Sequence, residues 1–311
     1  MGSLPGRLPI ATVTAPSAKP RVDVTPRRLP PHIRRRRFLL FVANHSVALT
    51  LAIVFLMPFV VVFLTALMSR QQALSTRYWP HPFVWSNFLH ISNFLPILRD
   101  GWNSTVYAVL SSVGVVVSSV PVAYALSRMR WRGRQIVFIL VLSTLMLPDQ
   151  VTSVPLYVIF VRFHWIGTLK PLIVPNFLGD AFSIFLLRQF FMTIPEELAD
   201  AARVDGAGDF RILTRVVIPL AKPALAAVAL FQFLYAWNDF YYPLLYAGNN
   251  PKTVTLAVGL SQLLSSVYVH FGVAWNILMA GSVIFMAPVI LIFFLAQRAF
   301  IEGVTLTGIK G

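Results

Sequence analysis

Six stretches of this chain are long and apolar enough to cross a lipid bilayer, and they constrain its fold more than any other feature. A helix needs roughly 20 mostly apolar residues to span the hydrocarbon core, at about 1.5 Å of rise per residue. The candidate spans cover residues 47–68, 105–127, 136–161, 172–191, 224–247 and 275–296. Because a segment in lipid must satisfy its own backbone polar groups, they predict an all-α polytopic membrane protein with six transmembrane helices.

The composition agrees with this fold class and excludes several functions. Hydrophobic residues make up 57% of the chain and charged residues 12%, both far from the values of soluble globular proteins. The net charge of +15 does not indicate nucleic-acid binding, because the basic residues lie in loops between spans and no groove-reading module is present. The absence of cysteine excludes disulfides, thiolate metal sites and cysteine catalysis.

The distribution of lysine and arginine predicts the orientation of the spans. With the N-terminus inside the cell, the cytoplasmic segments are the tail, the loops around 128–134 and 188–222, and the C-terminus; they hold 20 basic residues. The external loops around 69–102, 162–170 and 252 hold 6. Since basic residues favour the cytoplasmic side, we expect both termini inside.

The chain divides into two regions by composition. Residues 1–37 are rich in proline and arginine and poor in aromatic residues, which predicts a disordered, basic cytoplasmic tail. Its last four residues, Arg34 to Arg37, are all arginine and would lie at the inner membrane surface. Residues 38–311 then form the transmembrane domain.

A polar loop at 193–223 stands out between two apolar spans. It contains five carboxylates and four basic residues in a helical pattern interrupted by glycine. Thr193, Pro195 and Glu196 predict a helix start with a hydroxyl cap and acidic groups in the first turn. Gly206 predicts a sharp turn. Asp209 would cap a second helix ending near Pro219, with Phe210 and Leu213 projecting as apolar anchors, so we expect a docking surface for a soluble partner.

This loop resembles the EAA loop of the permease subunits of bacterial ATP-binding-cassette importers. The resemblance rests on Asp200-Ala201-Ala202, with aspartate where the family has glutamate, on Asp205-Gly206-Ala207, and on the ending Val216-Val217-Ile218-Pro219. Other segments resemble the carbohydrate-type branch in particular: Phe185 to Phe191, Trp237-Asn238-Asp239-Phe240 with Pro243-Leu244, and Gly303 to Gly311. The resemblance covers residues 38–311.

The resemblance implies a mechanical role in a bacterial inner membrane. The loop would form a coupling helix that inserts into a separate ATPase subunit, which binds the ATP; this chain itself needs no cofactor. Further implied partners are a second permease subunit, an extracytoplasmic substrate-binding protein and membrane lipid. The residues implied to couple to the ATPase are Asp200, Ala201, Ala202, Asp205, Gly206, Ala207, Phe210 and Pro219.

Polar groups inside the spans are candidates for a substrate pathway, because they are costly in lipid. They are Asp149, Gln232, Asn238 and Asp239, with Trp237 as a neighbouring aromatic face for a sugar. Gln232 and Asp239 are seven residues apart and would share one helix face toward a cavity. The alternative is that these groups satisfy broken backbone or bond to neighbouring helices. The partner subunit could equally hold most substrate contacts.

Three functions remain open at this level. The first is a translocation subunit for a sugar, polyol or glycerol phosphate ester, without catalytic activity of its own, since no catalytic or metal-ligating spacing is present. The second is a self-sufficient secondary transporter for a small polar solute, which would require inverted repeats and ion-coordinating broken helices. The third is a membrane scaffold or receptor, which predicts no ATP-dependent uptake.

Overall fold

The computed structural model describes residues 31–248, 250–270 and 274–307. Within these ranges, the side chains of residues 31–34, 36, 149, 266–270, 296 and 298–307 lie outside the description. Most of the predicted tail, residues 1–30, and the last four residues of the Gly303 to Gly311 match are likewise not described. The chain separates into two compact units, Met1–Leu56 and Met57–Gly311, each of which is described by itself.

The first helix, α1, runs over Pro31–Ala66 and crosses from the first unit into the second. It includes almost all of the predicted 47–68 span, and its apolar part Arg37–Ala66 is long enough to cross a membrane. The helix begins at Pro31, so the end of the predicted tail, including the arginine run, is helical. Proline is well tolerated in the first turn of a helix, where its missing N–H has no partner to lose.

The second unit is built from helices of very different lengths. Short helices follow α1: α2 (Arg70–Ala73), α3 (Asn87–His90) and the 3₁₀ turn η1 (Ile91–Asn93). The longer helices of the bundle are α4 (Ile97–Ser127), α5 (Arg134–Thr144), α6 (Asp149–Arg162), α8 (Ala181–Thr193), α12 (Lys222–Asn238), α14 (Leu256–His270) and α15 (Trp275–Thr307). Between them lie α7 (Lys170–Ile173), η2 (Val174–Leu178) and α13 (Tyr241–Tyr246).

The described residues confirm an almost wholly helical protein but not six uninterrupted spans. Four helical segments have the length and composition of a span: Arg37–Ala66, Ile97–Ser127, Lys170–Thr193 and Trp275–Leu295. The predicted 224–247 span is divided between α12 and α13, and α12 joins the preceding helix Asp209–Leu220 at an angle of 79°. The predicted 136–161 span is two helices, α5 and α6, because Pro148 lacks an N–H to continue a helix.

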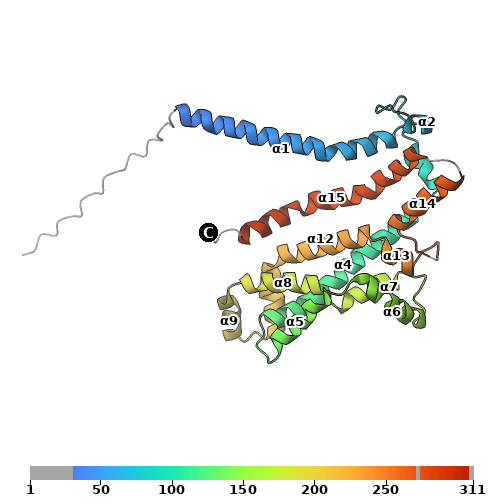
Figure 1. Ribbon diagram of the computed structural model, residues 1–311. Coiled ribbons are helices and arrows are strands. Elements are labelled where there is room, and N and C mark those ends of the chain that lie inside the picture. Colours follow the sequence, from blue (N-terminus) through green and yellow to red (C-terminus); the bar gives the residue numbers. More distant parts are fainter. Residues whose placement is uncertain (1–30, 249, 271–273, 308–311) are drawn as a thin grey trace, which may run out of the picture. The chain divides into compact units, whose positions relative to one another are not determined.

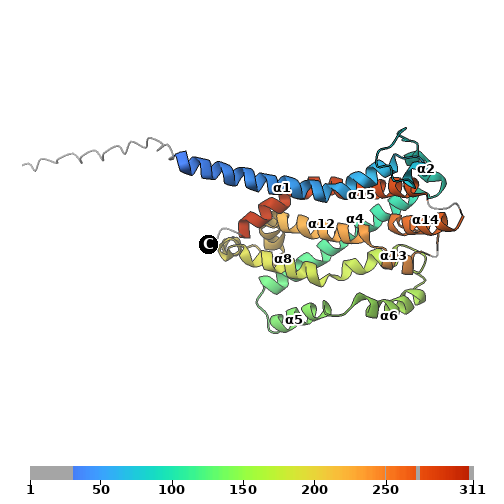
Figure 2. The ribbon, with the colours of Figure 1, turned by 45° about the horizontal axis from the view of Figure 1, so that its top comes forward.

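α4 is the central helix of the second unit, and it packs against α8, η2 and α12. Figures 1 and 2 both show it running alongside α8 and α12, while Figure 2 shows α5 and α6 following one another along the edge of the bundle. The buried face of α4 carries small residues, namely Ser104, Ala108, Ser111, Ser112, Gly114, Ser119 and Ala123. Small residues let helix backbones approach closely, which is the usual basis of helix packing in membranes.

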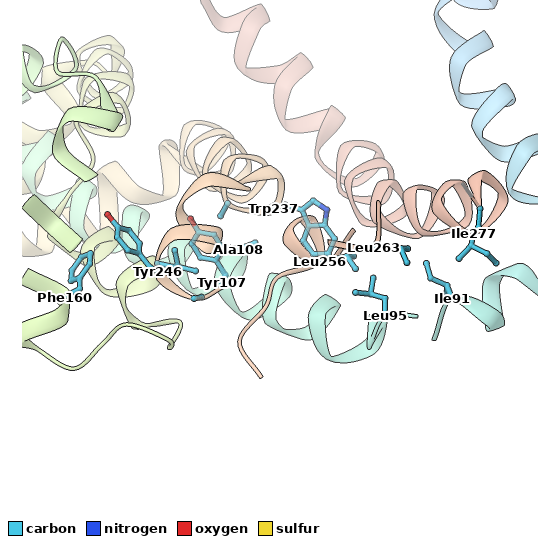
Figure 3. Packing of buried hydrophobic residues seen from close by; sticks show 14 residues of the cluster. Ile91, Leu95, Tyr107, Ala108, Phe160, Trp237, Tyr246, Leu256, Leu263 and Ile277 are labelled. Carbon is cyan, nitrogen blue, oxygen red and sulfur yellow. The ribbon is translucent and has the colours of Figure 1, made fainter. Parts of the chain in front are cut away.

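Two buried apolar clusters occupy the two ends of this unit. The first joins η1, α4, α6, α7, α12, α13, α14 and the start of α15; Figure 3 shows Tyr107, Trp237, Tyr246 and Leu256 among its members. The second joins the far half of α4 to α8, to the start of α12 and to the polar loop between them. The polar loop therefore lies at the opposite end of the bundle from α2 and α14 (Figure 1).

Two glycines of α4 give a matched test of this packing. A Cβ at Gly114 would lie 2.7 Å from the Phe177 ring and 3.2 Å from the Asn176 backbone, whereas a Cβ at Gly101 meets nothing within 4 Å. We expect Gly114→Ala to destabilise the detergent-solubilised protein by about 1 kcal/mol or more through overpacking. Gly101→Ala should be neutral or stabilising by up to about 1 kcal/mol, since alanine favours helices. Thermal unfolding followed by tryptophan fluorescence checks both, and equal effects would contradict the close α4–η2 contact.

Candidate functional site

The polar loop is a compact helical hairpin that begins directly at the end of α8. α9 covers Glu196–Val204, and Glu196 and Glu197 lie in its first turn as predicted. The predicted hydroxyl cap is wrong: Pro195 occupies the cap position, and the Thr193 hydroxyl donates to Phe190 O at 2.8 Å within α8. The acidic groups favour this helix end by facing its positive dipole.

Gly206 ends α9 in a Schellman turn. The Ala207 N–H donates to Ala202 O at 2.9 Å and the Gly206 N–H to Arg203 O at 3.0 Å, which are the two bonds of that motif. Gly206 has a φ of +78°, a left-handed conformation that only glycine adopts at little cost. Ala202 and Ala207 both pack against the second apolar cluster, as the motif requires of these positions. The glycine turn that the sequence predicts is therefore a Schellman turn at Gly206.

After Gly208 the chain forms a second helical segment with an unusual middle. α10 (Asp209–Ile212) passes into a π-helical turn, η3 (Leu213–Val217), and then into α11 (Ile218–Leu220). Asp209 is the first residue of this helix rather than its cap, because Gly208 takes the cap position. The helix continues one residue beyond Pro219 before the 79° bend into α12.

The apolar residues of the loop include an anchored set and two that are almost fully exposed. Ala199, Ile212, Leu213 and Val217 are buried in the second cluster. Leu213, predicted to project outward, is therefore part of the anchor. Phe210 is 79% exposed as expected, and Val204, which the sequence did not single out, is 88% exposed. Three residues that lie between these two are also exposed, namely Asp205, Gly206 and Gly208. Apolar side chains and glycine backbone therefore share one stretch of surface.

Ion pairs join residues within the loop, and a half-buried arginine holds the start of the loop to the bundle. Within the loop, Arg203 contacts Asp200 at 2.7 Å and Asp209 at 3.9 Å. The hydrogen bond that Arg203 donates to Asp200 raises the pKa of Arg203 above its usual value, so this arginine stays charged. At the end of α4, the Arg128 guanidinium donates to the carbonyls of Phe191 and Ile194, where α8 ends. The hairpin is thus clamped to α4.

A cavity of about 800 Å³ that is open to the surface lies between the α5–α6 connection, the start of α8 and α12. It is lined from the α5–α6 connection, from the start of α8 and from α12 by Thr144, Leu145, Leu147, Pro148, Asn176, Gly179, Asp180, Ala181, Phe182, Ser183, Phe231, Gln232 and Tyr235. Its size falls in the range of small-molecule sites. Of the predicted pathway residues whose side chains the structure describes, Gln232 is the one that lines it. Asn176 and Asp180 were not predicted from the sequence, although each had a signal that could have found it. Asn176 is an amide within an apolar run, and Asp180 follows a glycine at a helix start, where aspartate commonly caps.

Trp237, Asn238 and Asp239 do not line this cavity, and the side chain of Asp149, which follows the lining residue Pro148, lies outside the described residues. Trp237 is buried in the first cluster and donates from Nε1 to Phe285 O at 3.1 Å, so its ring packs against the core. Asn238 donates to Leu234 O at 2.8 Å on its own helix. Asp239 accepts from the Tyr107 hydroxyl at 2.8 Å and from the Tyr242 N–H at 3.2 Å. Gln232 and Asp239 therefore do not face one cavity, and Asp239 bonds to the backbone where α12 ends.

Comparison with known proteins identifies the family. The model of the family described as "Binding-protein-dependent transport system inner membrane component" matches residues 101–305, which is more than half of the chain and includes the polar loop. The chain belongs to this family. Its members are transport permeases, in keeping with the span-length helices described above.

Individual relatives of this permease family carry different names. The chain is 32% identical to the osmoprotective compounds uptake permease GgtD of Synechocystis, over 89% of this chain and 95% of that protein. It is 37% identical to the arabinooligosaccharide permease AraQ of Halalkalibacterium halodurans, over 72% and 80% of the two chains. It is 36% identical to the sn-glycerol-3-phosphate permease UgpE of Brucella abortus, over 66% and 72%.

The fold is shared with a solved transporter structure. A chain of a bacterial importer of the acidic polysaccharide alginate superposes with a TM-score of 0.73 at 24% identity, over 85% of this permease and 97% of that chain. This agreement supports the arrangement of helices.

Gly206 and Gly208 of the permease provide a matched test of the turn. A Cβ meets nothing within 4 Å at either position, but only Gly206 has a positive φ. Gly206→Ala should destabilise the turn by roughly 1–2 kcal/mol and so raise amide exchange of residues 206 and 207 by about tenfold. Gly206→Asn should restore slow exchange, because asparagine tolerates this conformation, and Gly208→Ala should leave it unchanged. Hydrogen exchange with mass spectrometry checks these outcomes; a Gly208 effect equal to that of Gly206 would contradict the turn.

Proposed function

We propose that this chain is one of two permease subunits of an ATP-binding-cassette importer for a sugar or a related polyol or glycerol phosphate. Family membership supports a transport permease, and the relatives named for arabinooligosaccharides and for sn-glycerol 3-phosphate support this substrate range. The driving ATPase, the second permease and an extracytoplasmic binding protein are its partners.

One structural observation carries the coupling role of the loop. The loop joins α8 directly to α12, and these two helices supply the Asp180, Phe182 and Ser183 side and the Phe231, Gln232 and Tyr235 side of the cavity. A force on the hairpin therefore acts on both walls through continuous backbone. ATP binding would close the ATPase pair, shift the hairpin as a rigid body, and change access to the cavity.

The exposed stretch from Val204 to Phe210 is the part of the loop suited to insertion into the ATPase. Phe210 and Val204 offer apolar anchors, and the glycines on either side of Ala207 let a partner backbone come close. The other predicted coupling residues act mainly by giving this surface its shape and charge; they are Asp200, Ala201, Ala202, Asp205, Ala207 and Pro219. The exposed carboxylates of Asp205 and Glu197 would face basic groups of the ATPase.

A self-sufficient secondary transporter remains the competing function. It would explain a polar cavity between broken helices. It gives no reason for a clamped, charged hairpin with exposed apolar side chains, because such a transporter has no soluble motor to bind. The two functions differ in whether uptake requires the ATPase.

Truncation of Phe210 tests the docking surface. We expect Phe210→Ala to weaken retention of the ATPase by about tenfold or more, as removal of a central apolar anchor typically costs at least about 1–2 kcal/mol. The matched control is Leu89→Ala, since Leu89 is 74% exposed in α3. The measurement is the affinity of the ATPase for the detergent-solubilised permease pair.

Each outcome has a clear meaning. Loss with Phe210→Ala alone supports docking at the loop, and ATP-dependent uptake should fall in parallel. Equal retention in both variants would contradict the loop as the docking surface. Uptake that persists in vesicles lacking the ATPase would favour the secondary transporter.

The absence of native cysteine allows a direct test of orientation. We propose that both termini and the hairpin face the cytoplasm, while α2 and the loop near Lys252 face outward. Ser75→Cys should react with a membrane-impermeant maleimide on intact spheroplasts, and Thr214→Cys should react only after permeabilisation. Both residues are exposed. The reverse pattern would overturn the orientation derived from the basic residues.

A further inference from the structure

Among the described residues that line the cavity, the polar side chains are amides, hydroxyls and one carboxylate. Gln232 donates from Nε2 to Asn176 Oδ1 at 3.1 Å, and Asn176 Nδ2 donates to Leu172 O at 2.7 Å. An amide side chain has two N–H donors and an oxygen with two acceptor positions. Gln232 therefore keeps an N–H and its oxygen for a solute, while Asn176 fixes the orientation of its amide. Such donor and acceptor pairs match the hydroxyl groups of a polyol.

Aromatic side chains face the same cavity. Phe182 of α8 and Phe231 of α12 lie edge to face with ring centroids 6.1 Å apart, and both are partly exposed. Tyr235 adds a third ring one turn along α12 and is 51% exposed. Aromatic rings beside a few fixed polar groups are the usual composition of a small-molecule site. The C–H faces of a sugar or polyol would pack on these rings.

The charge of the cavity argues against an anionic solute. Among the described lining residues, Asp180 is the only one that is charged near neutral pH, and none is lysine, arginine or histidine. Asp180 Oδ2 also accepts from the Ser183 N–H at 2.7 Å, so a carboxylate already occupies the positive end of α8. A phosphate entering here would meet like charge and no cation, which is unfavourable in a site partly shielded from water.

We propose that this cavity binds an uncharged, polyhydroxylated solute, such as a neutral sugar or polyol, and discriminates against phosphate esters. This inference rests on the proposed importer function and narrows its substrate range. Gln232 supplies the oriented hydrogen bonds, Phe182 and Phe231 supply the apolar faces, and Asp180 both accepts from hydroxyl groups and repels anions.

A reporter cysteine in the cavity tests this charge preference without a known substrate. Thr144 lines the cavity and is exposed, and its hydroxyl donates to Val141 O at 2.7 Å within its own helix. Thr144→Cys would be the sole thiol in this chain. In the purified, detergent-solubilised transporter with cysteine-free partner subunits, its labelling rates with a cationic and an anionic methanethiosulfonate are compared. Ser75→Cys, far from the cavity in sequence, calibrates the two reagents.

Asp180→Asn is the matched variant, because asparagine also caps helices and only the charge is lost. Relative to Ser75→Cys, Thr144→Cys should react at least about threefold faster with the cationic reagent, and Asp180→Asn should abolish that preference. Inorganic phosphate and sn-glycerol 3-phosphate should leave labelling unchanged. A preference for the anionic reagent, no effect of Asp180→Asn, or protection by either phosphate would overturn the proposal.

ATPase retention measured on the same preparations separates this proposal from the importer function. If the ATPase is retained but the cavity shows no preference for the cationic reagent, only the proposed substrate class is rejected. Loss of the ATPase from the unmodified transporter would reject the proposed function first.

Discussion

The fold depends on side-chain donors that bond carbonyl groups where helices end or break. Asn87 Nδ2 donates at 2.8 Å to both Ala66 O and Met68 O, and Asn103 Nδ2 donates to Lys252 O and Val254 O. Asn176 bonds Leu172 O near the end of α7 in the same way, and Arg128 bonds the carbonyls at the end of α8. Because a carbonyl shielded from water is costly to leave without a hydrogen bond, these donors stabilise the helix ends that they contact. The position of these polar groups therefore favours particular places for the chain to turn.

This constraint explains what the sequence could predict of the fold. Apolar length located α4 and α15 well, since an unbroken run of that length has few alternatives in a membrane. It did not reveal α14, whose apolar run is short, or the division of 136–161 at Pro148. The donor and its carbonyl are often distant in sequence, as with Asn103 and Val254. A local pattern cannot show such a bond.

The same limit, that a local pattern cannot show contacts between distant residues, explains why the loop was predicted better than the cavity. The Gly206 turn was predictable, because its bonds join residues five apart or fewer and its glycine is required by the backbone. Asp239 and Trp237 were placed on the pathway because polar and aromatic groups in spans usually have a function. Their partners, Tyr107 and Phe285, come from other helices and were invisible locally. The alternative for Asp239 was that it bonds backbone groups where a helix breaks. The hydrogen bond that it accepts from the Tyr242 N–H fits this alternative.

Rigidity of the hairpin is what makes a coupling role physically reasonable. A nucleotide-driven partner can shift a conformational equilibrium only by the difference in its binding energy between two states. A loose loop would follow the partner without moving α8 and α12. The difference in binding energy would then deform the loop and would not shift the conformation of the bundle. Here the Schellman turn, the Arg203 ion pairs and the Arg128 clamp leave the hairpin few ways to move alone. Work done on Phe210 must then reach the cavity walls, because the hairpin and those walls are successive parts of one chain.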